Sequence, residues 1–220
     1  MSLAKKILIG LGIVILAAAA LLVGSFLYMT IPTKGEKIGN YEKPNRALLV
    51  IDIQDDFSGP GSKMYNQDDA GAAIARANDV IARAEKSQWP IIYIRHEFSG
   101  CLACIAKVFM GGRGTHMSPG IVMDKRVAVK SKNEFIKHRG DSFSNPDLDA
   151  FLRKNSVNEL ILVGLDAQQC VYNTAKGALN RGYRVNIVTD AILLSAKEKW
   201  NELMEKYKRD GINILTSKDL

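Results

Sequence analysis

The hydrophobic positions of this chain follow two patterns, one long apolar run at the N-terminus and many short runs after it. The long run, Ile7–Ile31, holds no charged residue and follows Lys5 and Lys6. A helix needs roughly 20 apolar residues to cross a bilayer. We therefore expect residues 1–31 to form a retained transmembrane helix. A cleaved signal peptide is the alternative, because Ala17–Ala20 offers small residues, but its apolar core typically ends after about 7–15 residues.

Basic residues flank both ends of this run. Lys5 and Lys6 favour a cytoplasmic N-terminus. The opposite orientation is favoured by the basic residues beyond the other end: Lys34, Lys37, Lys43 and Arg46. We therefore expect a single-pass membrane protein. The charges do not decide on which side of the membrane its globular part lies. The polar stretch 32–45, with its Gly and Pro residues, is typical of a linker.

From residue 46 onward, apolar runs of strand length alternate with segments of helical periodicity. The expected strands are 47–53, 90–94, 127–129, 160–163, 185–188 and 212–215. The expected helices are 70–85, 148–154, 170–181 and 196–209. Such alternation is typical of a three-layer α/β/α domain with a mostly parallel central sheet. We expect one such domain, spanning 46–220.

The net charge is +7, from 30 basic and 23 acidic residues. The basic residues are scattered among acids, and no basic tract interleaved with aromatic residues is present. We therefore expect no nucleic-acid partner. Basic charge close to an apolar segment suits an anionic membrane surface instead.

The segment 159–191 places a cysteine between an expected strand and an expected helix. The crossover of such a strand–helix–strand unit puts Cys170 at the carboxyl edge of the sheet, where open α/β folds hold ligands. Helix amides favour a thiolate at this position and lower the pKa of the thiol. We therefore expect Cys170 to be a nucleophile with a lowered pKa. The alternative is a cysteine that only packs.

Two more polar residues fall at the ends of expected strands. Asp52 interrupts the apolar run of IDIQDDF, where a charged carboxylate is costly unless it is partnered or used. In the alternative interpretation it caps a turn, and Asp55 and Asp56 are solvated loop acids. Lys137 of IKHRGDSF follows an apolar pair, although most lysines face solvent. Because the ends of parallel strands converge, Asp52, Lys137 and Cys170 form a candidate nucleophilic site of base, cation and thiol.

In this order, IDIQDDF, KHRGDSF and GLDAQQCVYNTAKGALNRGYRV followed by TDA resemble the isochorismatase-like, or cysteine hydrolase, superfamily. Nicotinamidases, carbamoylsarcosine-type amidohydrolases and isochorismatases belong to it. The resemblance runs from about residue 45 to the C-terminus. It implies a homo-oligomer, a dimer or higher, in which neighbouring subunits contribute to the site.

The resemblance also implies the roles of individual residues. The catalytic triad would be Asp52, Lys137 and Cys170. The peptide bond between Leu165 and Asp166 would be cis, and the amides of Asp166 and Cys170 would form the oxyanion hole. The implied reaction is hydrolysis of a C–N bond in a small amide, ureide or lactam, through an acyl-enzyme on the cysteine.

Departures from the family pattern narrow the prediction of the cofactor and of the bond that is cleaved. Metal-binding nicotinamidases carry an Asp-x-His pair after the first motif, but no histidine lies between Phe57 and Ile94. We therefore expect no metal and no other cofactor. Isochorismatases cleave a vinyl ether and lack the cysteine. Two alternatives stay open: an ether hydrolase of this family, and a non-catalytic member that senses thiol oxidation or binds a ligand at Cys170.

The stretch HEFSGCLACIAKVFMGGRGTH contains four soft metal ligands: His96, Cys101, Cys104 and His116. They could bind zinc, or the CxxC pair could form a disulfide. The apolar residues between them predict a short helix with packed cysteines instead. The resemblance places a variable substrate-covering loop at about 98–123, and we favour a covering or packing role. The candidate substrate contacts are Phe57, Cys101 and Thr115.

Overall fold

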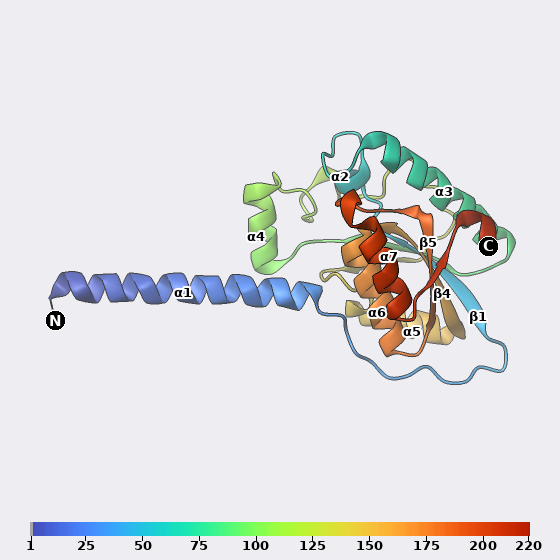
Figure 1. The fold of residues 1–220 in the computed structure, drawn as a ribbon, viewed down its shortest axis with the longest axis horizontal. Coiled ribbons are helices and arrows are strands. Elements are labelled where there is room, and N and C mark those ends of the chain that lie inside the picture. The colour runs from blue at the N-terminus through green and yellow to red at the C-terminus, as the bar shows by residue number, and fades with distance from the viewer. Residues whose placement is uncertain (1) are drawn as a thin grey trace.

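The sheet at the centre of the computed structural model, which describes residues 2–220, has six strands, all parallel (Figure 1). The strands are β1 (Asn45–Ile51), β2 (Ile91–His96), β3 (Glu134–Lys137), β4 (Val157–Leu165), β5 (Arg184–Leu193) and β6 (Asn213–Leu215). Their order across the sheet is β3-β2-β1-β4-β5-β6. The predicted parallel sheet is therefore confirmed.

Helices cover both faces of this sheet, which makes the three predicted layers. The helices are α1 (Leu3–Thr30), α2 (Asp55–Ser58), α3 (Gln67–Lys86), α4 (Gly100–Phe109), α5 (Pro146–Lys154), α6 (Tyr172–Asn180) and α7 (Trp200–Arg209). Of these, α3 covers one face, and α5, α6 and α7 cover the other. Alternate side chains of β1 point to opposite faces. Leu48 and Val50 pack with α3, whereas Leu49 and Ile51 pack with α5, α6 and α7. Burial on both faces explains why residues 47–51 of β1 are apolar without interruption.

Two local predictions are wrong. Residues 127–129 form no strand, because the Asp124 carboxylate accepts hydrogen bonds from the backbone and side chain of Arg126 and closes a turn there. Val127 is instead buried in the core cluster on the α3 face. The helix expected at 170–181 begins with a π-helical turn, Ala167–Val171, before α6. Cys170 therefore lies inside that turn and not at the first residue of an α-helix.

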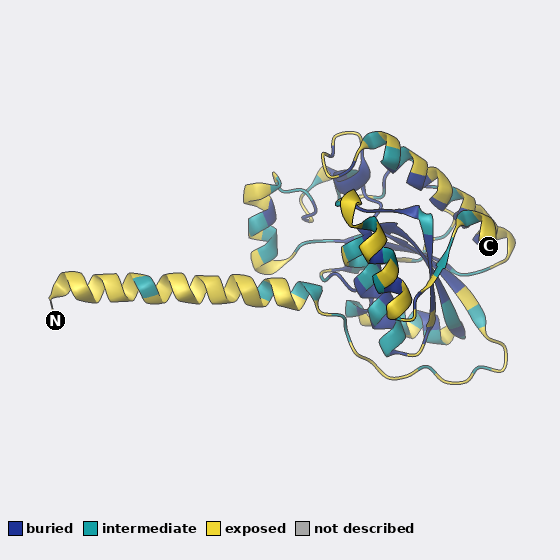
Figure 2. Cartoon of the chain, viewed as in Figure 1, coloured by how far each residue is buried: buried dark blue, intermediate teal, exposed yellow. Residues whose placement is uncertain are grey.

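The helix α1 projects away from the domain, and most of its side chains are exposed (Figure 2). It is long and apolar enough to be a membrane anchor or a signal sequence. Its C-terminal end is bonded to the loop after β3. Arg139 donates to the carbonyl oxygens of Tyr28 (2.8 Å) and Ile31 (2.7 Å), and its guanidinium lies over the Tyr28 ring. Gly140 N donates to Met29 O (2.8 Å). A cation at a helix C-terminus is favourably placed.

The stretch between α1 and β1 has no helix or strand, but it is held against the domain. Asp141 accepts from the backbone N (2.7 Å) and Oγ1 (2.6 Å) of Thr33. Arg181 donates to Thr33 and to the Lys34 carbonyl oxygen. Burial raises the pKa of Asp141, although the bonds from Thr33 oppose this. These contacts fix the direction in which α1 leaves the domain.

We expect Gly164→Ala to lower the free energy of unfolding by about 2 kcal/mol or more. Gly164 lies at the closest approach of β4 to β1, with φ +119°, and an added Cβ would overlap the Ile51 carbonyl oxygen. The matched control is Gly71→Ala inside α3, where an added Cβ meets nothing within 4 Å. It should leave stability unchanged or raise it by up to ~1 kcal/mol. Urea denaturation of both variants in detergent measures the difference, and equal stabilities would contradict the predicted overlap.

Candidate active site

The carboxyl ends of four neighbouring strands each deliver one polar side chain to a cluster, in which Asp52, His96 and Lys137 are buried and Cys170 is half-buried. Lys137 is the last residue of β3, His96 is the last of β2, and Asp52 directly follows β1. Cys170 lies in the π-helical turn after β4. Because β3, β2, β1 and β4 are adjacent in the sheet, these four groups meet. The structure thus brings together the three residues predicted from sequence and adds His96.

The Lys137 ammonium lies at the centre of the cluster. Its Nζ is 2.8 Å from Asp52 Oδ2 and 3.1 Å from each of three further atoms: His96 Nδ1, Arg139 O and Cys170 Sγ. Burial alone would lower the pKa of this lysine, but the negative charge of Asp52 and the neighbouring Cys170 outweigh it and raise the pKa. The residue is therefore a fixed buried cation.

Asp52 has one oxygen engaged and one free. Its Oδ2 accepts from Lys137, whereas Oδ1 is buried with no hydrogen-bond partner among the described residues. A carboxylate oxygen of Asp52 lies within 4.8 Å of Cys170 Sγ. Burial raises the pKa of Asp52, although Lys137 opposes this, and a raised pKa makes the carboxylate a stronger base. The residue has φ +55°, a left-handed conformation that aspartate tolerates better than most residues.

The predicted lowering of the Cys170 pKa is wrong. Burial raises the pKa of this thiol to about 12, and the negative charge of Asp52 acts in the same direction. The Lys137 ammonium opposes the rise without cancelling it. Desolvation and a neighbouring carboxylate thus dominate over any effect of helix amides. The resting cluster consequently holds a neutral thiol beside a carboxylate–ammonium pair.

His96 is the member of the cluster that the sequence analysis assigned only to a zinc quartet. Burial, and then the Lys137 charge, lower its pKa well below the usual value, so the imidazole is neutral. Because Nδ1 faces the Lys137 ammonium, we infer that it accepts and that Nε2 carries the proton. Nε2 is buried without a partner among the described residues. The sequence could have indicated this role, since His96 lies two residues after the expected strand 90–94.

The zinc quartet is not assembled in the described part of the chain. His96 faces Lys137, while Cys101, Cys104 and His116 are exposed, and both cysteines are free thiols. The cysteines also form no disulfide here.

The cluster around Lys137 contains the donor types of a metal site. Asp52, His96 and Cys170 offer zinc-type donors within 4.8 Å of one another. The Lys137 ammonium, however, lies within 3.1 Å of all three. A divalent cation would have to displace this ammonium, so the residues do not fit a metal.

The rest of the IDIQDDF motif holds the surroundings of the cluster. Gln54 Oε1 accepts from His96 N (2.6 Å), and its Nε2 donates to His96 O (3.1 Å). Asp56 is buried, and its two oxygens accept from Gly114 N (2.7 Å) and Ser118 Oγ (2.7 Å). The interpretation of Asp56 as a solvated acid is therefore wrong. This carboxylate ties the covering loop to the end of β1.

The three candidate substrate contacts lie in different places. The buried Phe57 ring packs near His96 (6.5 Å between centroids), and Phe98 packs edge-on against the same imidazole (4.5 Å). Thr115 is buried in the covering loop, where its Oγ1 donates to Gly112 O (2.6 Å). Cys101 is exposed on α4 and lines a cavity against α1. Phe57 is thus the candidate that packs directly against the cluster.

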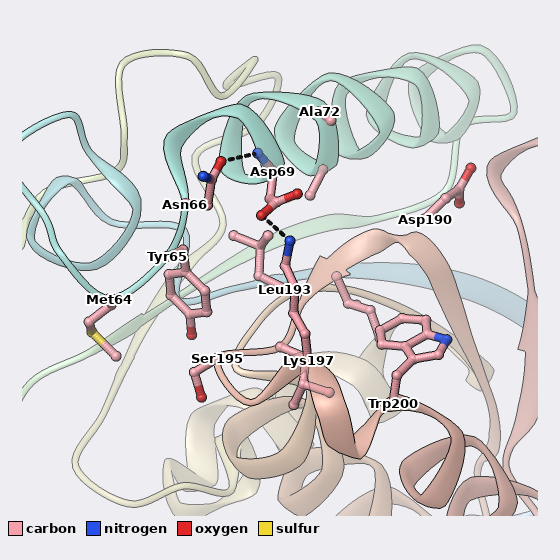
Figure 3. Close-up of a pocket in the computed structure, with 13 residues that line it drawn as sticks. Met64, Tyr65, Asn66, Asp69, Ala72, Asp190, Leu193, Ser195, Lys197 and Trp200 are labelled. Carbon is pink, nitrogen blue, oxygen red and sulfur yellow. Dashed lines mark hydrogen bonds and ion pairs between the residues drawn. The ribbon is translucent and has the colours of Figure 1, made fainter.

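Asp166 precedes the turn that holds Cys170 and bonds two residues that line a neighbouring cavity. The Leu165–Asp166 peptide bond is cis, as the resemblance implies. The Asp166 carboxylate accepts from Tyr65 Oη (3.2 Å), Ser195 N (2.9 Å) and Gln168 N (2.8 Å). Tyr65 and Ser195 line a cavity of about 610 Å³ between the start of α3 and the segment after β5 (Figure 3). Neither Asp52 nor Cys170 lines this cavity, so the triad is closed off from it in this conformation.

The comparisons with known proteins agree with this fold. A model of the isochorismatase domain matches residues 46–219, and the chain belongs to this family of isochorismatase-like hydrolases. An uncharacterized isochorismatase family protein of Bacillus subtilis (strain 168), YddQ, is 30% identical over 145 residues, 66% of this chain and 76% of that protein. The nicotinamidase of Escherichia coli (strain K12) is 27% identical over 176 residues, 67% of this chain and 82% of the relative.

Among solved structures, the N-carbamoylsarcosine amidase of Thermoplasma acidophilum superimposes with a TM-score of 0.65 at 25% identity. The superposition covers 79% of this chain and 96% of the amidase. The similarity therefore extends over almost the whole amidase.

We expect iodoacetamide to label Cys170 slowly at neutral pH and faster as the pH rises from 7 to 10. The reason is that the thiol is protonated below its pKa of about 12. In Asp52→Asn the labelling should begin at lower pH, because a negative charge that raises the thiol pKa is gone. Peptide mass spectrometry of the full chain measures both rates, with the exposed Cys101 and Cys104 as internal controls. Complete labelling of Cys170 at pH 7, ahead of both controls, would refute a raised pKa.

Proposed function

We propose that this protein hydrolyses a C–N bond of a small amide, ureide or lactam, with Asp52, Lys137 and Cys170 as its catalytic triad. The observation that carries the proposal is the buried Lys137 ammonium, which lies 2.8 Å from Asp52 and 3.1 Å from Cys170. A thiol beside a carboxylate with a free oxygen and a fixed cation is the arrangement of an activated nucleophile. Two similar proteins, a nicotinamidase and an N-carbamoylsarcosine amidase, bear the names of C–N hydrolases.

The first half of the reaction forms a thioester. Asp52 Oδ1 takes the thiol proton while Cys170 Sγ bonds to the carbonyl carbon, and the C=O electron pair moves to oxygen. The backbone amides of Asp166 and Cys170 would stabilise this oxyanion. The C–N bond then breaks, and Asp52 returns the proton to the leaving nitrogen. Because the proton moves during attack, a thiol that is protonated at rest remains competent.

The second half releases the acid. Asp52 takes a proton from water, and the resulting hydroxide attacks the thioester carbon. The C–S bond breaks, the carboxylic acid leaves, and the thiolate recovers the proton from Asp52. Throughout both halves, the Lys137 ammonium balances the negative charge that passes between Asp52 and Cys170.

Two alternatives are less well supported. A thiol sensor needs a reactive, accessible thiolate, whereas burial keeps the Cys170 pKa near 12. An ether hydrolase of this family would not need the cysteine, yet here its sulfur contacts the buried lysine at 3.1 Å. We therefore favour acyl transfer to the cysteine.

We further propose that α1 is a retained membrane anchor, that residues 32–45 connect it to the domain, and that residues 46–220 are the hydrolase. The support is that α1 is strongly apolar over its 28 residues and that none of them is buried. The bonds of Arg139 and Gly140 to the end of α1 would hold the domain close to the bilayer.

Replacing Cys170 by Ala should abolish hydrolysis and the acyl adduct that mass spectrometry detects in the wild-type chain. The probe is a panel of small primary amides, ureides and lactams. Asp52→Asn should lower kcat by about 10²–10⁴, because the base is lost. Cys104→Ser is the matched control and should retain full activity. Turnover of any panel substrate by Cys170→Ala at the wild-type rate would contradict the assignment of the catalytic triad.

His96 should contribute a donor to the substrate through its free Nε2–H. In His96→Asn the amide oxygen can replace Nδ1 as acceptor for Lys137, but the Nε2 donor is lost. In His96→Gln the amide nitrogen can replace Nε2, but the acceptor for Lys137 is lost. We expect His96→Asn to raise KM or lower kcat by about tenfold, as expected for one lost hydrogen bond, and His96→Gln to change the pH profile instead. The reverse pattern in steady-state kinetics would assign His96 to positioning Lys137 alone.

A further inference from the structure

The loop that covers the cluster has an unusual surface. Between Ser99 and Met123 it contains no acidic residue, and α4 within it carries a single charge, Lys107. Large apolar side chains of this loop are exposed: Val108 (75%), Phe109 (80%), Met117 (70%) and Val122 (50%). Val108 and Phe109 are adjacent on α4, and adjacent exposed apolar side chains mark a surface that binds a partner.

The position of α4 beside α1 identifies that partner. A cavity of about 730 Å³ separates the two helices, and its lining includes Ala17, Tyr28, Cys101 and Leu102. Figure 1 shows α4 outside the body of the domain, with its axis across that of α1. If α1 crosses a bilayer, a helix across it runs along the membrane plane.

The depth of α4 follows from the same contacts. Ala17 lies about 17 Å from Tyr28 along the helix, at 1.5 Å per residue. This is about half of a hydrocarbon core of ~30 Å. Tyr28 stands near the end of the uncharged run, where aromatic residues meet the membrane interface. The first turn of α4 therefore faces the part of α1 that spans the leaflet next to the domain.

We propose that α4 is a second membrane contact, inserted in the leaflet next to the domain, with Val108 and Phe109 among lipid acyl chains. This rests on α1 as a membrane anchor, as proposed above. Lipid is the occupant because α1 brings the bilayer to this level. The basic charge of Lys107 and Arg113, without any acid in the loop, also suits an anionic headgroup surface.

The test places a nitroxide spin label on single cysteines of the full chain in phosphatidylcholine–phosphatidylglycerol vesicles. The labelled variants are Phe109→Cys on α4, Ile15→Cys on α1 and, as the matched control, Val129→Cys. Val129 is also an exposed apolar residue (59%), but it precedes β3 and lines a different cavity from the one between α1 and α4. The native cysteines are replaced in all three: Cys101→Ser, Cys104→Ser and Cys170→Ser.

Collisions with oxygen report lipid, and collisions with a water-soluble nickel complex report solvent. We expect the label at 109 to resemble that at 15, with a severalfold higher oxygen-to-nickel ratio than at 129. A solvent-type ratio at 109 with a lipid-type ratio at 15 would overturn the proposal and leave the anchor intact. Protection of 109 from both reagents would also overturn it, since protein would then cover α4. A solvent-type ratio at 15 would remove the anchor and the proposal together.

Discussion

The buried ammonium of Lys137 is the constraint on which the site depends. A buried lysine is stable as a cation only if acceptors surround it, and here four neighbouring groups do so. Each acceptor is set by a different part of the fold: the end of β1, the end of β2, the loop after β3 and the turn after β4. Removing the cation would leave Asp52 as a lone buried carboxylate, whose charged form is costly. The lysine thus stabilises the fold locally and sets the protonation states of the site.

The same lysine links the site to the rest of the chain. Its third contact is the carbonyl oxygen of Arg139, and the side chain of Arg139 binds the end of α1. On the other side, Gln54 fixes the backbone of His96, and Asp56 holds the covering loop. Arg139 thus connects the cluster to the N-terminal helix, and Gln54 and Asp56 connect the segment after β1 to His96 and to the covering loop.

Strong patterns predicted the fold, because continuous apolar strands and amphipathic helices leave few alternatives. The three triad candidates could be placed together because the ends of parallel strands share one edge. What sequence could not supply was the environment at that edge. The pKa of Cys170 depends on burial and on its distance from Asp52, neither of which spacing reveals. Asp56 looks like any loop acid until its two oxygens are seen on Gly114 and Ser118. Residues 127–129 were expected to form a strand because they are apolar. A valine after a turn can be buried as well as one in a strand, so the sequence does not distinguish the two.

The raised thiol pKa changes what the site can do rather than weakening it. A thiolate at rest would react with any electrophile that entered, whereas a neutral thiol reacts when a carbonyl accepts its attack and Asp52 accepts its proton. That coupling requires three conditions: a base with a free oxygen, a fixed counter-charge and exclusion of water. Asp52 would be the base, Lys137 would be the counter-charge, and the covering loop would exclude water. The position of the loop is therefore part of the chemistry, because it determines whether the cluster is dry when the thiol gives up its proton. In a membrane-held loop, the bilayer would help to maintain that exclusion.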